Sequence, residues 1–390
     1  MKTTIHFAAL ALLSGFSLQP SALLAQGTLT PPGPPAPTMK TLDQIEARTP
    51  ISSLPYTITN PGSYYLTANL TGSSGADGID IATNNVTLDL NGFTLQGVAG
   101  SLNGINVLNP ARNLAIRNGA LDAWGHNGVD ATNSYNSQFE RLRVSNSNAG
   151  GLLAGTNCVV SACAAYHITG VGIFVRNNSS IKDCIANFNV AGLDVVANCT
   201  VIGCTASGNI NAGILAYGDN CTIKDCTAST GNGMGIQANN NCSVKDCTAS
   251  ACGTGIFVGN NSTVTGCTAG GNTGDGIDVA GFNCQIFGNT CSGNASSGIN
   301  IYYNNCQVIG NVCSANSQYG ILISGSANRI DGNSVGNNTN YGINAMSINV
   351  KNSITRNSSP GPGYGGYIGN NDYAPYGSPN TSTNPWQNFQ

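Results

Sequence analysis

Short runs of alternating hydrophobic and polar residues fill most of this chain, and the runs repeat at a short period. Three consecutive units, at 220–240, 241–260 and 261–282, read NCTIKDCTASTGNGMGIQANN, NCSVKDCTASACGTGIFVGN and NSTVTGCTAGGNTGDGIDVAGF. Each unit crosses a Gly- and Asn-rich turn and closes on Gly-Ile and a few further residues. Such a period, with two-residue alternation and no helical periodicity, predicts a solenoid of β-strands.

A Gly followed by Ile, Val or Leu marks each predicted coil. It recurs at thirteen positions with a mean spacing of about 22 residues, a period typical of solenoids. A coil of this length can hold three short strands, and at about 4.8 Å per coil the stack would be on the order of 60 Å long. The thirteen glycines are Gly78, Gly104, Gly128, Gly151, Gly172, Gly192, Gly213, Gly235, Gly255, Gly276, Gly298, Gly320 and Gly342.

Asparagine and cysteine also recur once per coil. Asn tolerates left-handed backbone, and its amide can bond to the amide one coil away, so a stacked Asn column is expected at a bend. The Asn column is assigned to positions 157, 178, 198, 220, 241, 261, 283, 305, 328 and 349. Two Cys columns are assigned to 158, 199, 221, 242, 284 and 306 and to 163, 184, 204, 226, 247, 267, 291 and 313, which leaves only Cys252 of the 15 cysteines outside them.

The cysteines are interpreted as buried free thiols. Their total is odd, Ser179 and Ser262 replace Cys in the first column, and Cys alternates in phase with inward Val and Ile. Small, weakly polar thiols pack well in a narrow β core. The alternative is a disulfide between some neighbouring coils, although side chains that point the same way make its torsion awkward. Metal ligation is not expected, because no His lies beside the Cys pairs.

The N-terminal part of the chain carries signals for export. A basic start, a short apolar run and small residues near a cut make residues 1–25 a predicted signal peptide, and a Pro-rich linker covers 26–40. Residues 41–75 are predicted to form an N-terminal cap and the strand leading into the first coil, including a short helix that Pro50 ends. A cap is expected because a solenoid exposes unpaired backbone at its ends.

The remaining chain divides into a repeat region and a tail. The parallel β-helix is assigned to 76–356, and a Gly-, Pro- and Tyr-rich tail to 357–390. The aromatic residues of the tail are expected to lie over the last coil or along the rod, and disorder of the tail is the alternative.

Composition limits the partners. Charged residues make up 8% of the chain, against roughly a quarter in average proteins, and the formal net charge is −3. Nucleic acid is not expected as a partner, because phosphate binding needs a concentrated basic face. No segment is apolar enough to span a membrane, so the protein is expected to be secreted, periplasmic or held at the cell surface.

Several stretches resemble a known family. They are VTLDLNGFTLQG at 86–97, LAIRNGALDAWGHNGVDA at 114–131, the Gly-Ile-Asp-Val coils and the closing NPWQNF. They are similar to secreted bacterial right-handed parallel β-helix repeat proteins of the pectate-lyase-like superfamily, over roughly residues 41–390. The resemblance implies an all-β fold, a single-stranded right-handed parallel β-helix of about thirteen coils with an N-terminal cap. It leaves function open, because such solenoids include lyases, hydrolases, epimerases and inert surface proteins.

The catalytic signatures of the enzymatic relatives are missing. The Asn-Thr-Asp, Asp-Asp, Gly-His-Gly and Arg-Ile-Lys motifs of polygalacturonases do not occur. The regular coils also hold no compact group of acids beside an Arg like the calcium-binding cluster of pectate lyases. No metal ligands are therefore assigned and no cofactor is predicted, with Ca²⁺ left open.

The residue after each Gly-Ile pair is expected to point outward, because the residues on either side of it point into the core. We call this series the outward column. It consists of Asp80, Asn106, Asp130, Leu153, Phe174, Asp194, Leu215, Gln237, Phe257, Asp278, Asn300, Leu322 and Asn344.

The first coils supply the candidate site. Asp80 and Asp130 would lie two coils apart, roughly 10 Å, near the upper limit for the acid and base of inverting glycoside hydrolysis. With His126 they are the candidate catalytic residues. The candidate substrate-binding residues are Asn106, Arg117 for pairing with a uronate and Trp124 for stacking on a sugar. The alternative is that these acids bond their own turns and the charges solvate irregular coils.

The sequence therefore favours a protein that contacts extracellular polysaccharide, and leaves open whether it processes an acidic glycan in a lyase- or hydrolase-like reaction. The alternatives are a non-catalytic surface, adhesion or structural rod and, more remotely, an assembly module that adds strands at an uncapped end.

Overall fold

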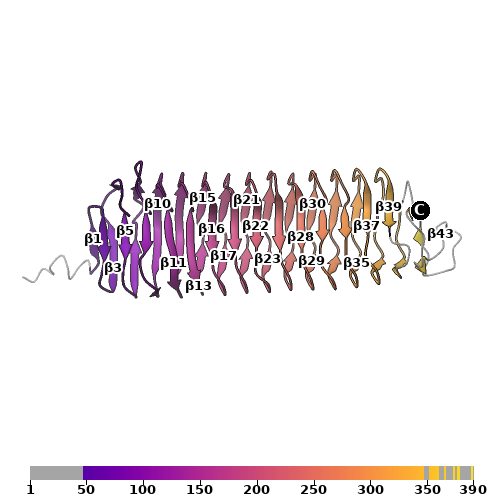
Figure 1. Ribbon diagram of the computed structural model, residues 1–390, viewed down its shortest axis with the longest axis horizontal. Coiled ribbons are helices and arrows are strands. Elements are labelled where there is room, and N and C mark those ends of the chain that lie inside the picture. The colour runs from indigo at the N-terminus through magenta and orange to yellow at the C-terminus, as the bar shows by residue number, and fades with distance from the viewer. Residues whose placement is uncertain are drawn as a thin grey trace, which may run out of the picture. The chain divides into compact units, whose positions relative to one another are not determined.

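The computed structural model describes residues 47–346 and 351–359 and four two-residue strands nearer the C-terminus. The predicted signal peptide, the Pro-rich linker, all but the last two residues of the predicted short helix and most of the predicted tail lie outside the described residues. Every regular element among the described residues is a β-strand, and all strand pairs are parallel, in a solenoid whose coils stack one on the next (Figure 1).

One strand of each coil belongs to a 16-stranded sheet, here called sheet 1. Its strands are β2 (Tyr56–Ile58), β5 (Ile79–Ile81), β8 (Ile105–Val107), β11 (Val129–Tyr135), β13 (Leu152–Thr156), β16 (Val171–Val175), β19 (Ala191–Val195), β22 (Ala212–Ala216), β25 (Met234–Ala238), β28 (Thr254–Val258), β31 (Ile277–Val279), β34 (Ile299–Ile301), β37 (Tyr319–Ile323), β39 (Tyr341–Ala345) and β41 (Tyr364–Gly365), with β9 (Ala111–Arg112) pairing beside β11.

The other strands of each coil belong to a 26-stranded sheet, here called sheet 2, which is made of two columns. The first column holds β1 (Thr49–Ile51), β3 (Gly62–Leu66), β6 (Val86–Asp89), β14 (Val159–Ser161), β17 (Ser180–Lys182), β20 (Thr200–Ile202), β23 (Thr222–Lys224), β26 (Ser243–Lys245), β29 (Thr263–Thr265), β32 (Gln285–Phe287), β35 (Gln307–Ile309), β38 (Arg329–Asp331), β40 (Ser353–Thr355) and β42 (Asp372–Tyr373).

The second column holds β4 (Leu70–Thr71), β7 (Thr94–Gln96), β15 (Ala164–Tyr166), β18 (Ile185–Asn187), β21 (Thr205–Ser207), β24 (Thr227–Ser229), β27 (Thr248–Ser250), β30 (Thr268–Gly270), β33 (Thr290–Ser292) and β36 (Val312–Ser314). The long strands β10 (Ala115–Asp122) and β12 (Gln138–Ser145) span both columns. Two further strands, β43 (Tyr376–Gly377) and β44 (Asn388–Phe389), pair with each other.

The thirteen predicted coils are confirmed. Each marker Gly lies directly before a strand of sheet 1 or at its second position, from β5 to β39, and β2 and β41 add one strand at either end. Parallel pairing starts at Thr49, within the segment 41–75 that was expected to be a cap and leading strand. The interior is filled by aliphatic side chains that repeat from coil to coil, because each position lies above its counterpart in the neighbouring coil.

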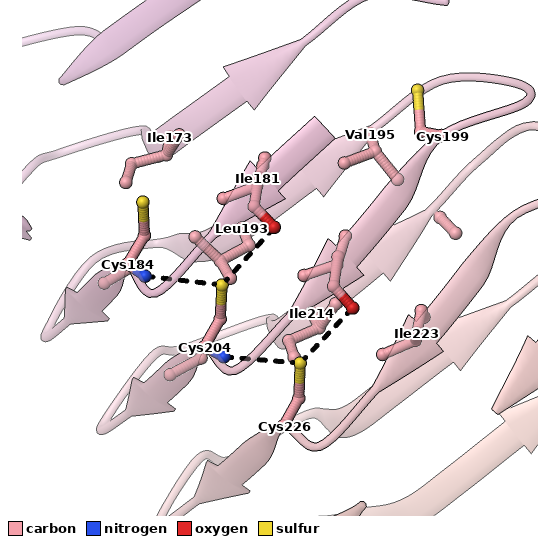
Figure 2. Close-up of a cluster of buried hydrophobic side chains, with 14 of the residues drawn as sticks. Ile173, Ile181, Cys184, Leu193, Val195, Cys199, Cys204, Ile214, Ile223 and Cys226 are labelled. Atoms are coloured by element: carbon pink, nitrogen blue, oxygen red, sulfur yellow. Dashed lines mark hydrogen bonds between the residues drawn. The ribbon is translucent and has the colours of Figure 1, made fainter. Parts of the chain in front are cut away.

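The cysteines are free and buried, as predicted. Most of them lie at the bends between strands, where their sulfur atoms accept hydrogen bonds from backbone N–H groups of the neighbouring coil (Figure 2). The backbone N–H of Cys184 donates to Cys204 Sγ at 3.5 Å, and that of Cys204 donates to Cys226 Sγ at 3.5 Å. Each thiol in turn faces carbonyl oxygens, as Cys204 does with Ile202 at 3.2 Å. The column therefore satisfies buried backbone groups that a bend would otherwise leave unpaired.

The assignment of Cys291 and Cys313 to the second Cys column is wrong. The N–H of Cys267 donates to Asn289 Oδ1 at 2.8 Å, so Asn289 takes the next place in that column. Cys291 instead pairs in register with Ala269 and Cys313, inside the strands. Position 291 lies farther from 267 than the coil period at this point of the chain, and that longer gap was the available signal.

The left-handed Asn column is confirmed for its first eight members, which have φ between 54° and 62°. Asn220 donates to Asn198 Oδ1 at 3.2 Å and Asn283 donates to Asn261 Oδ1 at 3.0 Å, one coil away in each case. The ninth assignment is wrong by one residue, because Ala327 has the left-handed backbone and Asn328 is buried in the first Cys column. Position 349 lies outside the described residues.

Candidate functional site

The outward column exists with the register that the sequence predicted. Asp80 pairs with Asn106 and Asn106 with Asp130, and the series continues in register to Asn344. All its members lie on the outer side of sheet 1, yet none is fully exposed. The column therefore runs along a partly covered face, where polar atoms need partners.

The first three coils hold a hydrogen-bonded group of polar side chains on this face, here called the Asp80 cluster. Its members are Asp77, Asp80, Asn103, Asn106, His126, Asn127 and Asp130.

Asn106 connects the acids of the first coil. Its Nδ2 donates to Asp77 Oδ2 at 2.9 Å and to Asp80 Oδ1 at 3.3 Å. Asp77 Oδ1 accepts the backbone N–H of Asn103 at 2.7 Å. The two carboxylates therefore share one amide, which holds them on the same side of the sheet.

The third coil completes the cluster. His126 Nδ1 lies 3.0 Å from Asn103 Oδ1, and Asn127 Nδ2 donates to Asp130 Oδ2 at 3.2 Å. Asp130 Oδ1 accepts the hydroxyl of Thr132 at 2.8 Å. Asp80, Asn106, His126 and Asp130, four of the six candidate residues from the sequence, are thus brought together.

Electrostatics distinguish Asp80 within this cluster. Burial raises the pKa of its carboxyl above the usual value, and the charge of Asp77 raises it further, whereas the hydrogen bond from Asn106 opposes this. Three carboxyl groups meet here, and none of the seven members is Lys or Arg. The cluster is therefore rich in hydrogen-bond acceptors.

Close packing of the coils explains why Asp77 and Asp80 flank a Gly-Ile pair. A Cβ on Gly78 would lie 2.5 Å from the carbonyl oxygen of Gly104, so only glycine fits there. Ile79 points into the core and turns Asp80 outward. Three members of the cluster were not predicted from the sequence, although each directly precedes a marker glycine and that position was the available signal. They are Asp77, Asn103 and Asn127.

The prediction that Trp124 stacks on a sugar is wrong. Its side chain is 0% exposed, and its Nε1 donates to the carbonyl of Leu95 at 3.0 Å. The ring fills space beside Gly72, Gly78 and Gly104, where added Cβ atoms would lie 2.6 to 2.9 Å from it. A Trp in this position packs the irregular early coils and cannot reach a ligand.

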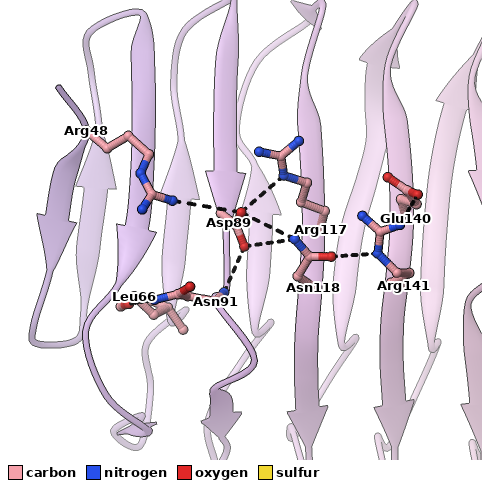
Figure 3. Close-up of polar contacts among 8 residues, drawn as sticks. All are labelled: Arg48, Leu66, Asp89, Asn91, Arg117, Asn118, Glu140 and Arg141. Atoms are coloured by element: carbon pink, nitrogen blue, oxygen red, sulfur yellow. Dashed lines mark hydrogen bonds and ion pairs between the residues drawn. The ribbon is translucent and has the colours of Figure 1, made fainter. Parts of the chain in front are cut away.

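The prediction that Arg117 belongs to the same site is also wrong, because Arg117 lies in sheet 2. Its Nε is 3.2 Å from Asp89 Oδ2, and Arg48 approaches the same oxygen at 3.9 Å (Figure 3). Burial pushes the pKa of Asp89 upward, but hydrogen bonds from Asn91, Asn118 and Arg117 outweigh it and hold the pKa below the usual value. Arg117 therefore stabilises β6 against β10.

Two shallow hollows lie elsewhere. One of about 330 Å³ is lined by apolar side chains including Phe188 and Ile210, beside His167. The other, of about 370 Å³ on sheet 2, is lined by Arg141, Arg143 and Asp183 together with small and apolar residues. Neither contains a member of the Asp80 cluster.

Over the described ranges, no group of three or more His, Cys, Asp and Glu residues is arranged to hold a metal ion. Those same ranges contain no helix that is long and apolar enough to cross a membrane.

Comparison with known proteins bears on the fold. A family described as "Right handed beta helix region" matches residues 77–228, 198–286 and 219–359. A search of curated protein sequences gave no match.

Solved structures similar to this chain include an epimerase module and a phage tailspike. The A-module of mannuronan C-5 epimerase AlgE6 from Azotobacter vinelandii is 17% identical, with a TM-score of 0.53, over 81% of this chain and 91% of its own. A double mutant of the tailspike protein of E. coli bacteriophage HK620 is 16% identical, with a TM-score of 0.49, over 76% of this chain and 64% of its own. At this identity the similarity to the epimerase module shows the fold alone.

Proposed function

The chain belongs to the right-handed β-helix family, and from this premise we propose that it binds an extracellular or periplasmic polysaccharide along the outer face of sheet 1. The observation that carries the proposal is the Asp80 cluster, in which carboxylates and amides from three successive coils form one hydrogen-bonded group. Carboxylate and amide groups held in fixed positions can bind several hydroxyls at once. Because the outward column repeats at a constant spacing from coil to coil, it suits a ligand that is a linear polymer.

Charge favours a neutral, hydroxyl-rich glycan over an acidic one. A uronate placed here would face Asp77, Asp80 and Asp130 with no Lys or Arg in the cluster, and like charges at contact distance repel. Arg117, the expected uronate partner, is paired with Asp89 in the other sheet. An acidic glycan would need a bridging cation such as Ca²⁺.

Hydrolysis is the second candidate function. The raised pKa of Asp80 suits a general acid, and Asp130 accepts hydrogen bonds from Thr132 and Asn127. However, Asn106 pairs in register between the two acids, in the space that an inverting mechanism leaves for water. Binding without cleavage therefore fits this arrangement better.

The proposal is tested with a glycan array on the purified protein, run with and without calcium. We expect binding to neutral glycans without calcium. The double variant Asp80→Asn/Asp130→Asn should weaken the best hit by about tenfold or more, as expected for loss of central polar contacts. Asp246→Asn, an exposed acid beside Lys245 in sheet 2, serves as the matched control and should bind normally.

New reducing ends in the same samples would show hydrolysis. A protein that binds no glycan at all, or a double variant that binds as well as the wild type, would contradict the proposal and leave the non-catalytic rod.

A further inference from the structure

The chain repeats the core of the Asp80 cluster in its tenth and eleventh coils. Asp-Gly-Ile-Asp occurs at 77–80 and again at 275–278. Asn300 Nδ2 donates to Asp275 Oδ2 at 3.0 Å, as Asn106 does to Asp77 at 2.9 Å. The backbone N–H of Ser297 donates to Asp275 Oδ1 at 2.8 Å and fixes that carboxylate. We call Asp275, Asp278, Ser297, Asn300 and Tyr302 the Asp278 cluster.

The two clusters differ in how well their polar atoms are paired. In the first, Asn106 also donates to Asp80. In the second, Asp278 Oδ1 and Asn300 Oδ1 are both buried and have no hydrogen-bond partner. Asn300 is only 4% exposed, and its amide orientation is set by the bond to Asp275, so its free atom is an acceptor. Buried acceptors without partners are costly, and a donor from a ligand would remove that cost.

The same unpaired acceptor recurs farther along the outward column. Asn344, two coils beyond Asn300, is 5% exposed, and its Oδ1 also lacks a partner. The outward column thus holds four unpaired acceptors, at Asp194, Asp278, Asn300 and Asn344. The last three lie within four successive coils, and a ligand that brings several donors, as the hydroxyls of a sugar do, would pair them.

Tyrosine side chains lie near these acceptors, whereas the Asp80 cluster contains no tyrosine. Tyr302 follows β34 and is 47% exposed, and its pKa is raised by burial and by the nearby charges of Asp278 and Asp275. Tyr319 and Tyr341 directly precede the marker glycines two and three coils later, the same position that Asp275 has in its coil. Their rings are stacked, with 6.3 Å between the ring centroids and an interplanar angle of 11°. Tyrosine offers a flat apolar face together with a hydroxyl, a combination suited to a sugar ring.

We propose that the Asp278 cluster is a second glycan-binding site, which takes a neutral, hydroxyl-bearing sugar unit against Asn300 and Tyr302. This proposal rests on the proposed function for the chemical class of the ligand, whereas the position of the site follows from the Asp278 cluster itself. Asp80 and Asp278 are nine coils apart in the outward column, on the order of 43 Å at about 4.8 Å per coil. A trisaccharide is too short to reach both clusters, whereas a polysaccharide could occupy both.

The test uses short probes so that the two sites are counted separately. Maltotriose, cellotriose, mannotriose, xylotriose and chitotriose are each titrated by calorimetry into the purified protein. We expect at least one probe to bind with two equivalents, and the Asp80→Asn/Asp130→Asn variant to keep one of them. In that background Tyr302→Ala should weaken the remaining site by about tenfold or more.

The matched control is Tyr303→Ala. Tyr303 is the next residue and is 42% exposed. Its ring packs on that of Phe282, with 4.7 Å between the ring centroids, rather than on the cluster. It should leave binding within about twofold, as a residue outside the contact does. A second variant, Asn300→Leu, introduces the residue type that Leu322 has at the next position of the column, and it should weaken the same site. Circular dichroism checks that each variant folds.

The possible results separate the two proposals. Loss of all binding in the Asp80→Asn/Asp130→Asn variant would overturn the second site and support the first. Binding lost only through Tyr302→Ala would support the second site and contradict the first. No binding of any probe would contradict both, and binding that EGTA abolishes would replace the sugar site with a cation site.

Discussion

At the scale of single residues, Asp194 shows what the outward column costs when no partner is supplied. It lies between Phe174 and Leu215 in the column and is 3% exposed, with one carboxylate oxygen unpaired. Burial raises its pKa to about 7. The nearby Tyr217 has its own pKa raised by the charge of Asp194. An isolated ionised carboxylate is disfavoured in such surroundings because it loses water without gaining a partner.

This predicts a pH-dependent loss of stability. The folded-state pKa is above the unfolded value, so the folded state holds the proton more tightly, and stability falls as the pH rises from about 4 to 7. Asp194→Asn should therefore change the melting temperature little at pH 4 and raise it clearly at pH 8, where the gain in unfolding free energy is at most about 4 kcal/mol.

Thermal melts of both proteins from pH 4 to 8 provide the measurement. Asp183→Asn, which removes an exposed acid beside Lys182, should show no such trend. An equal shift for Asp194→Asn at both pH extremes would contradict the assigned titration.

At the scale of structural elements, the bends of sheet 2 use Cys and Asn in the same place. Cys204, Cys226, Cys247 and Cys267 are followed in one column by Asn289, and the series continues with Asn311, Asn333 and Asn357. Asn311 Oδ1 accepts both the backbone N–H and the Nδ2 of Asn289, at 2.9 and 3.0 Å. Each Asn therefore pairs buried groups of two coils, which makes the column a continuous polar ladder inside the core.

This ladder predicts unequal effects of two substitutions at a fully buried position. Asn311→Ala removes the acceptor of the Asn289 N–H and Nδ2 and the donor to the Ile286 carbonyl, and should cost roughly 3 kcal/mol or more. Asn311→Cys restores an acceptor of the kind that Cys267 supplies upstream, and should cost clearly less. Denaturant unfolding measures both, and equal losses would show that a thiol does not replace the amide as an acceptor here.

At the scale of the whole molecule, each described coil contacts its neighbours through parallel strands and a shared core. Stability in such a stack is approximately a sum over coils and the interfaces between them. All 15 cysteines lie in this core and are at most 2% exposed. The thiols are therefore internal probes of the coils that carry them.

We expect none of the 15 thiols to react with a thiol reagent in the native protein, and all to react in denaturant, because reaction needs an accessible thiolate. Counting modified cysteines by mass spectrometry checks this. Fast reaction of any thiol under native conditions would mean that its coil opens locally or that its burial is wrong.

The sequence by itself determined the parallel solenoid, its thirteen coils and the register of the outward column. It could do so because parallel stacking turns a linear period directly into neighbours in space. Asp80, Asn106 and Asp130 were placed side by side for this reason, since each lies two residues after a marker glycine.

Only the tertiary structure decided where the side chains of Trp124 and Arg117 lie. Trp124 fills space left by glycines of neighbouring coils, and Arg117 lies in sheet 2 rather than on the face of the outward column. The unpaired oxygens of Asp278 and Asn300 were equally invisible in the sequence. All these outcomes depend on contacts between coils where the repeat is irregular, and a period carries no information about those contacts.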